Sequence, residues 1–181
     1  MDNNDETYLS ELQTQSRFAL RAITYADLAL RDNSDTSDID EFWYHIQMFL
    51  VSIANVSKMM YQGSNKPCLE KYKVHHERIV SEYNLPDTFF IDEKRMRNSY
   101  EHYDENLINW LNKPMKVRGL NNIGPIDGFI VGLKFNYLKH YDPTTNLLHF
   151  DNKSINLTDA YDQLVVLDQH IEEILQQARH G

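Results

Sequence analysis

Hydrophobic side chains recur at alternating spacings of three and four along much of the chain, which is the period of an amphipathic α-helix. The pattern predicts one helix over residues 7–31 and a second over residues 40–61. The polar segment DNSDTSD separates them, and its Ser37 or Asp38 is suited to cap the second helix. That second helix has the broader apolar face, which is typical of a helix at the centre of a bundle.

Two further helices are predicted between residues 67 and 112. A moderately amphipathic pattern covers residues 67–83 and is closed by Pro86. A cleaner pattern covers residues 91–112 and is stopped by Pro114. Both boundaries follow from proline, which disfavours helical backbone in the residue before it.

The pattern changes between residues 128 and 150, where β-branched and aromatic side chains flank the turn sequence Asp-Pro-Thr-Thr. We therefore expect a β-hairpin over 128–150, in which His140 and His149 could face each other and serve a structural role. A last helix is predicted over 158–179. The expected fold is mainly α: a single domain, 1–181, built as a bundle of about five helices with the hairpin inserted before the last one.

Composition narrows the class of protein. The 181 residues include 41% hydrophobic and 25% charged residues, the balance of a folded chain. No apolar run is long enough to span a bilayer, and the N-terminus is acidic where a signal peptide would be basic. Cys68 is the only cysteine, which excludes a disulfide framework or a cysteine-rich zinc site. We expect a cytoplasmic protein without a membrane segment.

The net charge of −9 argues against a broad surface that grips the phosphates of a nucleic acid. The charge is uneven, however. From Lys94 to Arg118 six basic residues stand against three acidic ones. Any contact with a polyanion is therefore expected in that window.

The predicted helix 91–112 lies largely in this basic window and divides into two faces when its residues are placed 100° apart. One face is an apolar stripe: Met96, Tyr100, Tyr103, Leu107 and Trp110. The opposite face is polar: Arg97, Asn98, Glu101, His102 and Glu105. A guanidinium can hold phosphate with paired hydrogen bonds, and an imidazole exchanges protons near neutral pH. The pair suits cleavage of RNA by attack of the ribose 2′-hydroxyl.

The segment Arg97-Asn98-Ser99-Tyr100-Glu101-His102 resembles the signature of the HEPN superfamily, an arginine and a histidine separated by four to six residues, often with asparagine after the arginine. The resemblance implies an all-helical bundle and a metal-independent ribonuclease that dimerises through the motif face, as in toxins and antiviral defence proteins. Other members have lost activity. Transferred to this chain, Arg97 would bind the scissile phosphate, His102 would transfer protons, Asn98 would orient either group, and Glu101 would hold Arg97.

The leading interpretation is thus an endoribonuclease without metal or cofactor, acting on RNA as a homodimer through the polar face of residues 91–112, with an antitoxin or regulatory protein as a further partner. The alternative is a non-catalytic HEPN-like module for dimerisation or partner binding. A third interpretation treats the polar face as solvated surface, with Arg97 and Glu101 forming an ordinary ion pair.

Other candidate residues lack the spacing of a known site. His75, His76 and Glu77 adjoin, and Glu41 precedes His45 by four, but neither set matches a metal-binding helix pattern, so surface histidines are expected. The glycines of RGLNNIGPIDGFIVG lack the Gly-Lys-Ser/Thr ending of a phosphate loop and are expected in turns that bound the hairpin.

Overall fold

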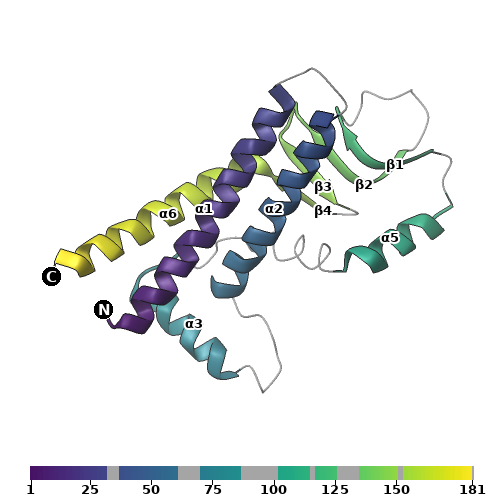
Figure 1. Ribbon diagram of the computed structural model, residues 1–181. Helices are drawn as coiled ribbons and strands as arrows, with labels where there is room; N and C mark the ends of the chain where they lie inside the picture. The colour runs from purple at the N-terminus through teal and green to yellow at the C-terminus, as the bar shows by residue number, and fades with distance from the viewer. Residues whose placement is uncertain are drawn as a thin grey trace.

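The computed structural model describes residues 1–31, 37–60, 70–86, 102–114, 117–125, 135–150 and 153–180. Over these residues the chain is mostly helical, with five helices and a small four-stranded sheet placed before the last helix (Figure 1). The mainly α class and the strands ahead of the final helix were both predicted. Within the described helices, none is long and apolar enough to cross a membrane.

The two long N-terminal helices are confirmed, with slightly different ends. Helix α1 (Asn3–Arg31) begins where the Asp2 carboxylate accepts the backbone N–H of Asp5 at 2.8 Å, which caps the first turn. Helix α2 (Ser37–Met60) runs antiparallel beside α1, so that Gln15 bonds Asn55 and Tyr25 stacks on His45.

Two more predicted helices lie against this pair. Helix α3 (Glu70–Glu82) covers most of the stretch expected over 67–83. Helix α6 (Leu157–His180) packs along α1, and Arg17 joins them by ion pairs to Asp168 and Glu172 at 2.7 and 2.9 Å. Oδ1 of Asn156 accepts the backbone N–H groups of Thr158 and Asp159 in the first turn of α6, which explains why the helix begins directly after a strand.

The predicted hairpin is present over the described residues 135–150 as strands β2 (Phe135–Asp142) and β3 (Leu147–Phe150). It forms half of a larger sheet. Strand β1 (Val117–Ile123) pairs parallel to β2, and β4 (Lys153–Asn156) pairs antiparallel to β3, in the order β1-β2-β3-β4. Neither outer strand was predicted.

Not every glycine that was expected in a turn lies in one. Gly119 lies inside β1, because this strand forms by pairing with β2 rather than from its own sequence pattern. Gly124 follows the strand directly in a bend, with φ 148°, a backbone conformation that favours glycine. Gly128 and Gly132 lie outside the described residues.

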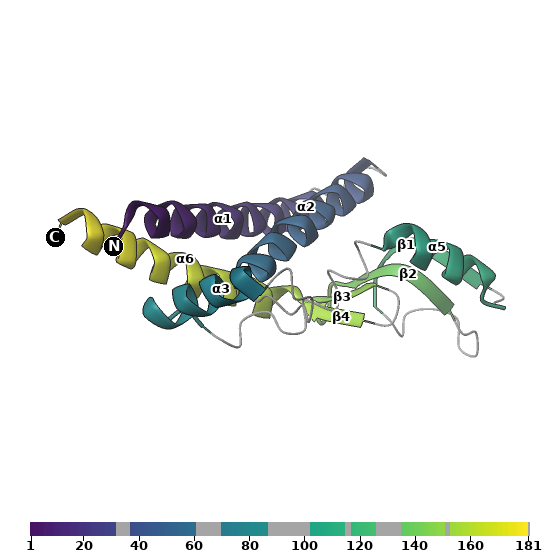
Figure 2. The same cartoon turned by 90° about the horizontal axis from the view of Figure 1, so that it is seen from below.

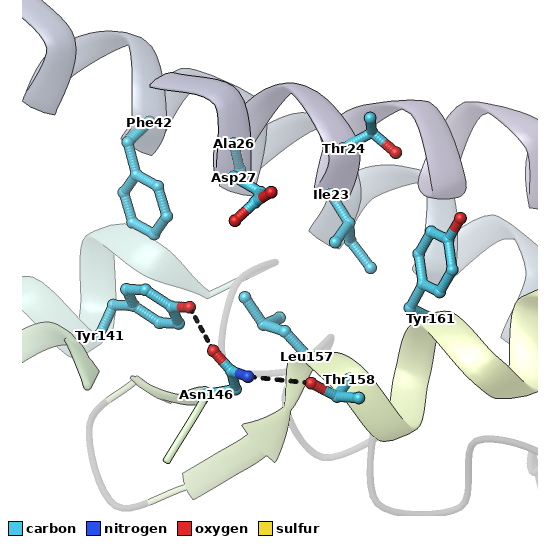
Figure 3. A pocket seen from close by; sticks show the side chains of 10 residues that line it. All are labelled: Ile23, Thr24, Ala26, Asp27, Phe42, Tyr141, Asn146, Leu157, Thr158 and Tyr161. Carbon is cyan, nitrogen blue, oxygen red and sulfur yellow. Dashed lines mark hydrogen bonds between the residues drawn. The ribbon is translucent and has the colours of Figure 1, made fainter. Parts of the chain in front are cut away.

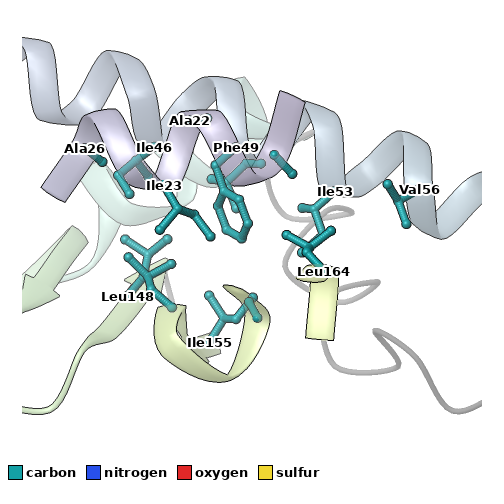
Figure 4. Packing of buried hydrophobic residues seen from close by; sticks show 14 of the residues in the cluster. Ala22, Ile23, Ala26, Ile46, Phe49, Ile53, Val56, Leu148, Ile155 and Leu164 are labelled. Carbon is teal, nitrogen blue, oxygen red and sulfur yellow. The ribbon is translucent and has the colours of Figure 1, made fainter. Parts of the chain in front are cut away.

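The molecule has two layers (Figure 2). The α1–α2 pair forms one layer, and α6 with the sheet, joined end to end, forms the other. The buried side chains between them form one cluster, part of which is drawn in Figure 4: Ala22, Ile23, Ala26, Ile46, Phe49, Ile53, Val56, Leu148, Ile155 and Leu164. Burial of each large side chain contributes about 1.5–3 kcal/mol, so this cluster holds the layers together.

Candidate functional site

The last residue of the predicted motif, His102, lies at the beginning of helix α5 (Tyr103–Asn112). Its backbone angles, φ −104° and ψ 38°, are not helical, and its carbonyl accepts the N–H of Asn106 at 3.0 Å. The imidazole is 63% exposed. His102 therefore occupies the N-cap position of a helix and is open to solvent.

This position corrects the prediction of an unbroken helix over 91–112 with His102 in its interior. Asp104 and Glu105 follow His102 directly, and acidic side chains are favoured in the first turn, where they oppose the positive end of the helix dipole. The two acidic residues thus signal a helix start, which the continuous apolar spacing of residues 91–112 does not reveal. The predicted end is confirmed, since Lys113 is extended and precedes Pro114.

Glu105 is the described neighbour of the His102 ring. Its Oε1 lies 3.4 Å from Nδ1, and both side chains are exposed. The carboxylate therefore lies on the Nδ1 side of the imidazole ring. The sequence analysis placed Glu105 on the polar face but gave it no role. Residues three apart on a helix can touch, so the spacing between His102 and Glu105 was the signal for this contact.

The remaining motif residues, Arg97, Asn98 and Glu101, lie outside the described residues. The structure consequently brings together His102 and Glu105 but does not describe the arginine–histidine pair. Two members of the predicted apolar stripe, Met96 and Tyr100, also lie outside.

The described part of the apolar stripe faces the core as predicted. Trp110 is buried, and Tyr103 and Leu107 pack against the hydrophobic cluster. The Tyr103 ring lies 5.9 Å from the Phe150 ring and 5.5 Å from the ammonium of Lys139. These contacts attach the N-terminal end of α5, and with it His102, to strands β2 and β3.

The two hairpin histidines do face each other across β2 and β3, as predicted. Their ring centroids are 5.7 Å apart, and the ring of Tyr137 stacks on His140 at 4.8 Å. His140 is 1% exposed, and the Asn122 side-chain amide lies 2.7 Å from its Nδ1. Burial lowers the pKa of both histidines, and the neighbouring His149 lowers the pKa of His140 further.

This histidine pair lies on the other sheet face from α5. Side chains alternate between faces along a strand, so Lys139 and Tyr141, which contact α2, point away from the face of His140. The pair therefore does not share a site with His102.

The other histidines singled out by the sequence make local contacts. His76 is half-buried rather than on the surface, because its Nδ1 lies 2.6 Å from the carbonyl of Met59 and 2.9 Å from the hydroxyl of Tyr8. His45 pairs with Glu41 at 2.9 Å. Among the described residues, no group of three or more His, Cys, Asp or Glu side chains is placed to hold a metal ion. Cys68 lies outside them.

Comparison of the chain with protein-family models, curated proteins and solved structures finds no significant match.

Proposed function

We propose that this protein is a metal-independent endoribonuclease of HEPN type, a cytoplasmic toxin or defence factor built on a helical bundle. The observation that carries the proposal is the exposed imidazole of His102, which ends the Arg97–His102 motif and stands at the start of a helix beside Glu105. A solvent-accessible imidazole with a carboxylate on one ring nitrogen is suited to proton transfer at the other.

In the proposed reaction, Nε2 of His102 takes the proton of a ribose 2′-hydroxyl as that oxygen attacks the adjacent phosphorus. The bond from phosphorus to the 5′-oxygen breaks, which leaves a 2′,3′-cyclic phosphate and a 5′-hydroxyl. The leaving oxygen needs a proton, and one histidine cannot readily serve as both base and acid. We therefore assign the acid to His102 of the partner subunit in a homodimer formed through the polar face of residues 91–112.

The charge on the phosphate needs a cation near His102. The start of α5 offers backbone N–H groups, and its N-cap side chain forms no capping hydrogen bond. However, Asp104 and Glu105 place two carboxylates at the same helix end. These carboxylates repel an anion, so the helix start by itself does not supply the positive charge. Arg97 is the motif residue that would supply the cation, with Asn98 and Glu101 as its supports.

A second function has an observation in its favour. Ile108 and Leu111, three residues apart on α5, are 58% and 45% exposed, and neighbouring exposed apolar side chains can form a contact surface. They favour the alternative of a non-catalytic HEPN-like module that dimerises or binds a partner protein through α5.

Cleavage of RNA by wild type and variants separates the two functions. We expect purified protein to cut single-stranded RNA in EDTA, and His102→Ala to lower the rate by about 10²–10⁴-fold, the usual contribution of a general base. His180→Ala removes an exposed imidazole from the end of α6 and serves as the control. Absence of cleavage on every RNA tested, or dependence on a divalent ion, would contradict the proposal.

Replacing Arg97 with lysine tests the cation itself. Lysine keeps the charge but cannot form two parallel hydrogen bonds to phosphate. We expect Arg97→Lys to slow cleavage by about 10²–10³-fold, the cost of losing one preorganised electrostatic contact. Unchanged cleavage in a normally folded variant would mean that Arg97 is a solvated surface residue.

A further inference from the structure

A cavity of about 310 Å³ opens where the two layers meet, between the C-terminal half of α1, the start of α2, the β2–β3 turn and the start of α6 (Figure 3). Pockets that bind small molecules span about 300–1,000 Å³, so this one is suited to a small ligand. It lies apart from His102, and its function is independent of catalysis there.

One part of the cavity wall is apolar. Ile23, Ala26, Phe42 and Leu157 line it, and all four side chains are buried. The Phe42 and Tyr141 rings lie 4.9 Å apart on one side, and Tyr161 stands on the other side in Figure 3. This wall can pack against the hydrophobic part of a ligand, because its surface is apolar and partly aromatic.

Two hydroxyl groups of the cavity wall donate their protons to neighbouring groups. The Tyr141 hydroxyl donates to Oδ1 of Asn146 at 2.8 Å, and Nδ2 of Asn146 lies 3.0 Å from Oγ1 of Thr158. The Thr24 hydroxyl donates to the carbonyl of Leu20 at 2.9 Å. The hydroxyl oxygens of Tyr141 and Thr24 consequently remain as hydrogen-bond acceptors.

Asp27 adds a negative charge to this set of acceptors, and in Figure 3 its carboxylate points into the cavity. Its Oδ2 pairs with Arg31 at 2.7 Å, but the two side chains are 55% and 74% exposed. An exposed pair of this kind contributes at most about 1 kcal/mol, so a ligand can compete for the carboxylate. Burial raises the pKa of Tyr141, and the charges of Asp27 and Asp142 raise it further, so the negative potential reaches across the cavity.

We propose that this cavity binds a small primary amine with an apolar or aromatic body. The ammonium lies beside Asp27 and donates to the hydroxyl oxygen of Tyr141, and the body packs against Phe42 and Leu157. Aromatic faces also attract a cation, which favours an ammonium next to Tyr141. A carboxylate ligand meets the like charge of Asp27 and is disfavoured.

Titration of the full-length protein with three probes of similar shape tests this proposal. We use 2-phenylethylamine, the neutral 2-phenylethanol and the anionic phenylacetate, and follow binding by amide chemical shifts and calorimetry. We expect saturable binding of the amine with shifts at Ile23, Tyr141 and Leu157, and binding of the other two at least about tenfold weaker, because charge-assisted hydrogen bonds are the stronger ones. Equal binding of amine and alcohol, or no saturable binding of the amine, would overturn the proposal.

Asp27→Asn then tests the carboxylate at nearly constant size. We expect the variant to bind 2-phenylethylamine about tenfold or more weakly while its binding of 2-phenylethanol stays the same. The side chain is more than half exposed, so circular dichroism should show an intact fold. Glu173→Gln makes the same charge change on the exposed C-terminal half of α6 and should bind like wild type. Undiminished amine binding by Asp27→Asn would show that the Asp27 carboxylate does not bind the ammonium.

Discussion

At the scale of single residues, the histidine pair of the sheet shows how burial controls charge. His140 and His149 have their Nε2 atoms buried, with no hydrogen-bond partner recorded for either in the described part of the chain. A buried imidazolium without a partner is costly, so both rings are neutral in the folded state. Protonation must then favour the unfolded chain.

We expect the free energy of unfolding to fall as the pH drops below about 6.5, the ordinary histidine value. The folded pKa of each ring is lowered, so the unfolded chain takes up protons first, and stability is lost until the pH passes below the folded pKa values. Urea unfolding between pH 5 and 7.5 measures this slope. His149→Leu should flatten it, whereas His180→Leu, on the surface, should leave it unchanged. A slope identical in His149→Leu and wild type would show that the ring titrates freely.

A second buried ionisable group is the carboxylate of Asp5 on α1, a residue that is 2% exposed. Arg78 contacts both of its oxygens, and the Tyr83 hydroxyl donates to Oδ2 at 2.8 Å. The hydrogen bonds from Arg78 hold the pKa of Asp5 below its usual value, although burial opposes them. This network connects α1 to α3.

Asp5→Asn should destabilise the fold by about 1–3 kcal/mol, because the amide cannot accept every bond that the carboxylate accepts. The loss should be full at neutral pH and should shrink as the pH falls through the folded pKa of Asp5, where wild type also loses the charge. Thermal melts at pH 7 and pH 3 measure it. Asp162→Asn, an exposed change on α6, is the control; equal melting temperatures for the two variants would contradict the role of the network.

At the scale of elements, strand β1 depends on a close approach to its neighbour. Gly119 pairs with Tyr137 in the parallel β1–β2 register. A Cβ at Gly119 would lie 2.6 Å from Cδ1 and 2.8 Å from Cε1 of the Tyr137 ring. No side chain fits there unless that ring moves, and the ring is stacked on His140.

Gly119→Ala should therefore displace the Tyr137 ring and cost about 1–3 kcal/mol, the usual penalty of overpacking. Chemical denaturation gives the loss, and the aromatic proton shifts of Tyr137 report the displaced ring. Asn121→Ala, an exposed change on the same strand, should cost less than 1 kcal/mol. A Gly119→Ala variant as stable as wild type would mean that β1 can move away from β2 without loss.

At the scale of the whole molecule, the two layers bury the apolar faces of α1, α2 and α6 against one another and against the sheet. Helix α5 stands at the sheet end with its buried side turned to β2 and β3. On its outer side Ile108 and Leu111 are exposed, and this is where we place the dimer contact.

We predict that light scattering at micromolar concentration gives twice the mass of one chain. Ile108→Glu should shift the mass to that of a monomer, because it puts a charge on an exposed apolar side chain of the proposed interface. Val74→Glu makes the same change at an equally exposed position on α3 and should stay dimeric. A wild-type protein of single-chain mass would contradict the homodimer and the composite active site together.

The sequence determined the long elements. Helices α1, α2 and α6 were predicted within a few residues because their apolar spacing persists for many turns, and the β2–β3 turn because Asp142 and Pro143 favour one locally. The motif that leads to His102 was also visible, since it needs only spacing and residue type.

The tertiary structure decided what depends on distant partners. Strand β1 contains Gly119, Asn121 and Asn122, and β4 has only four residues, so pairing with β2 and β3 is what makes them strands. The burial of His140 and the cavity beside Asp27 likewise arise from segments far apart in the chain. A residue pattern reports the local period of the backbone, whereas burial, exposure and cavities are set by which faces meet when the layers pack.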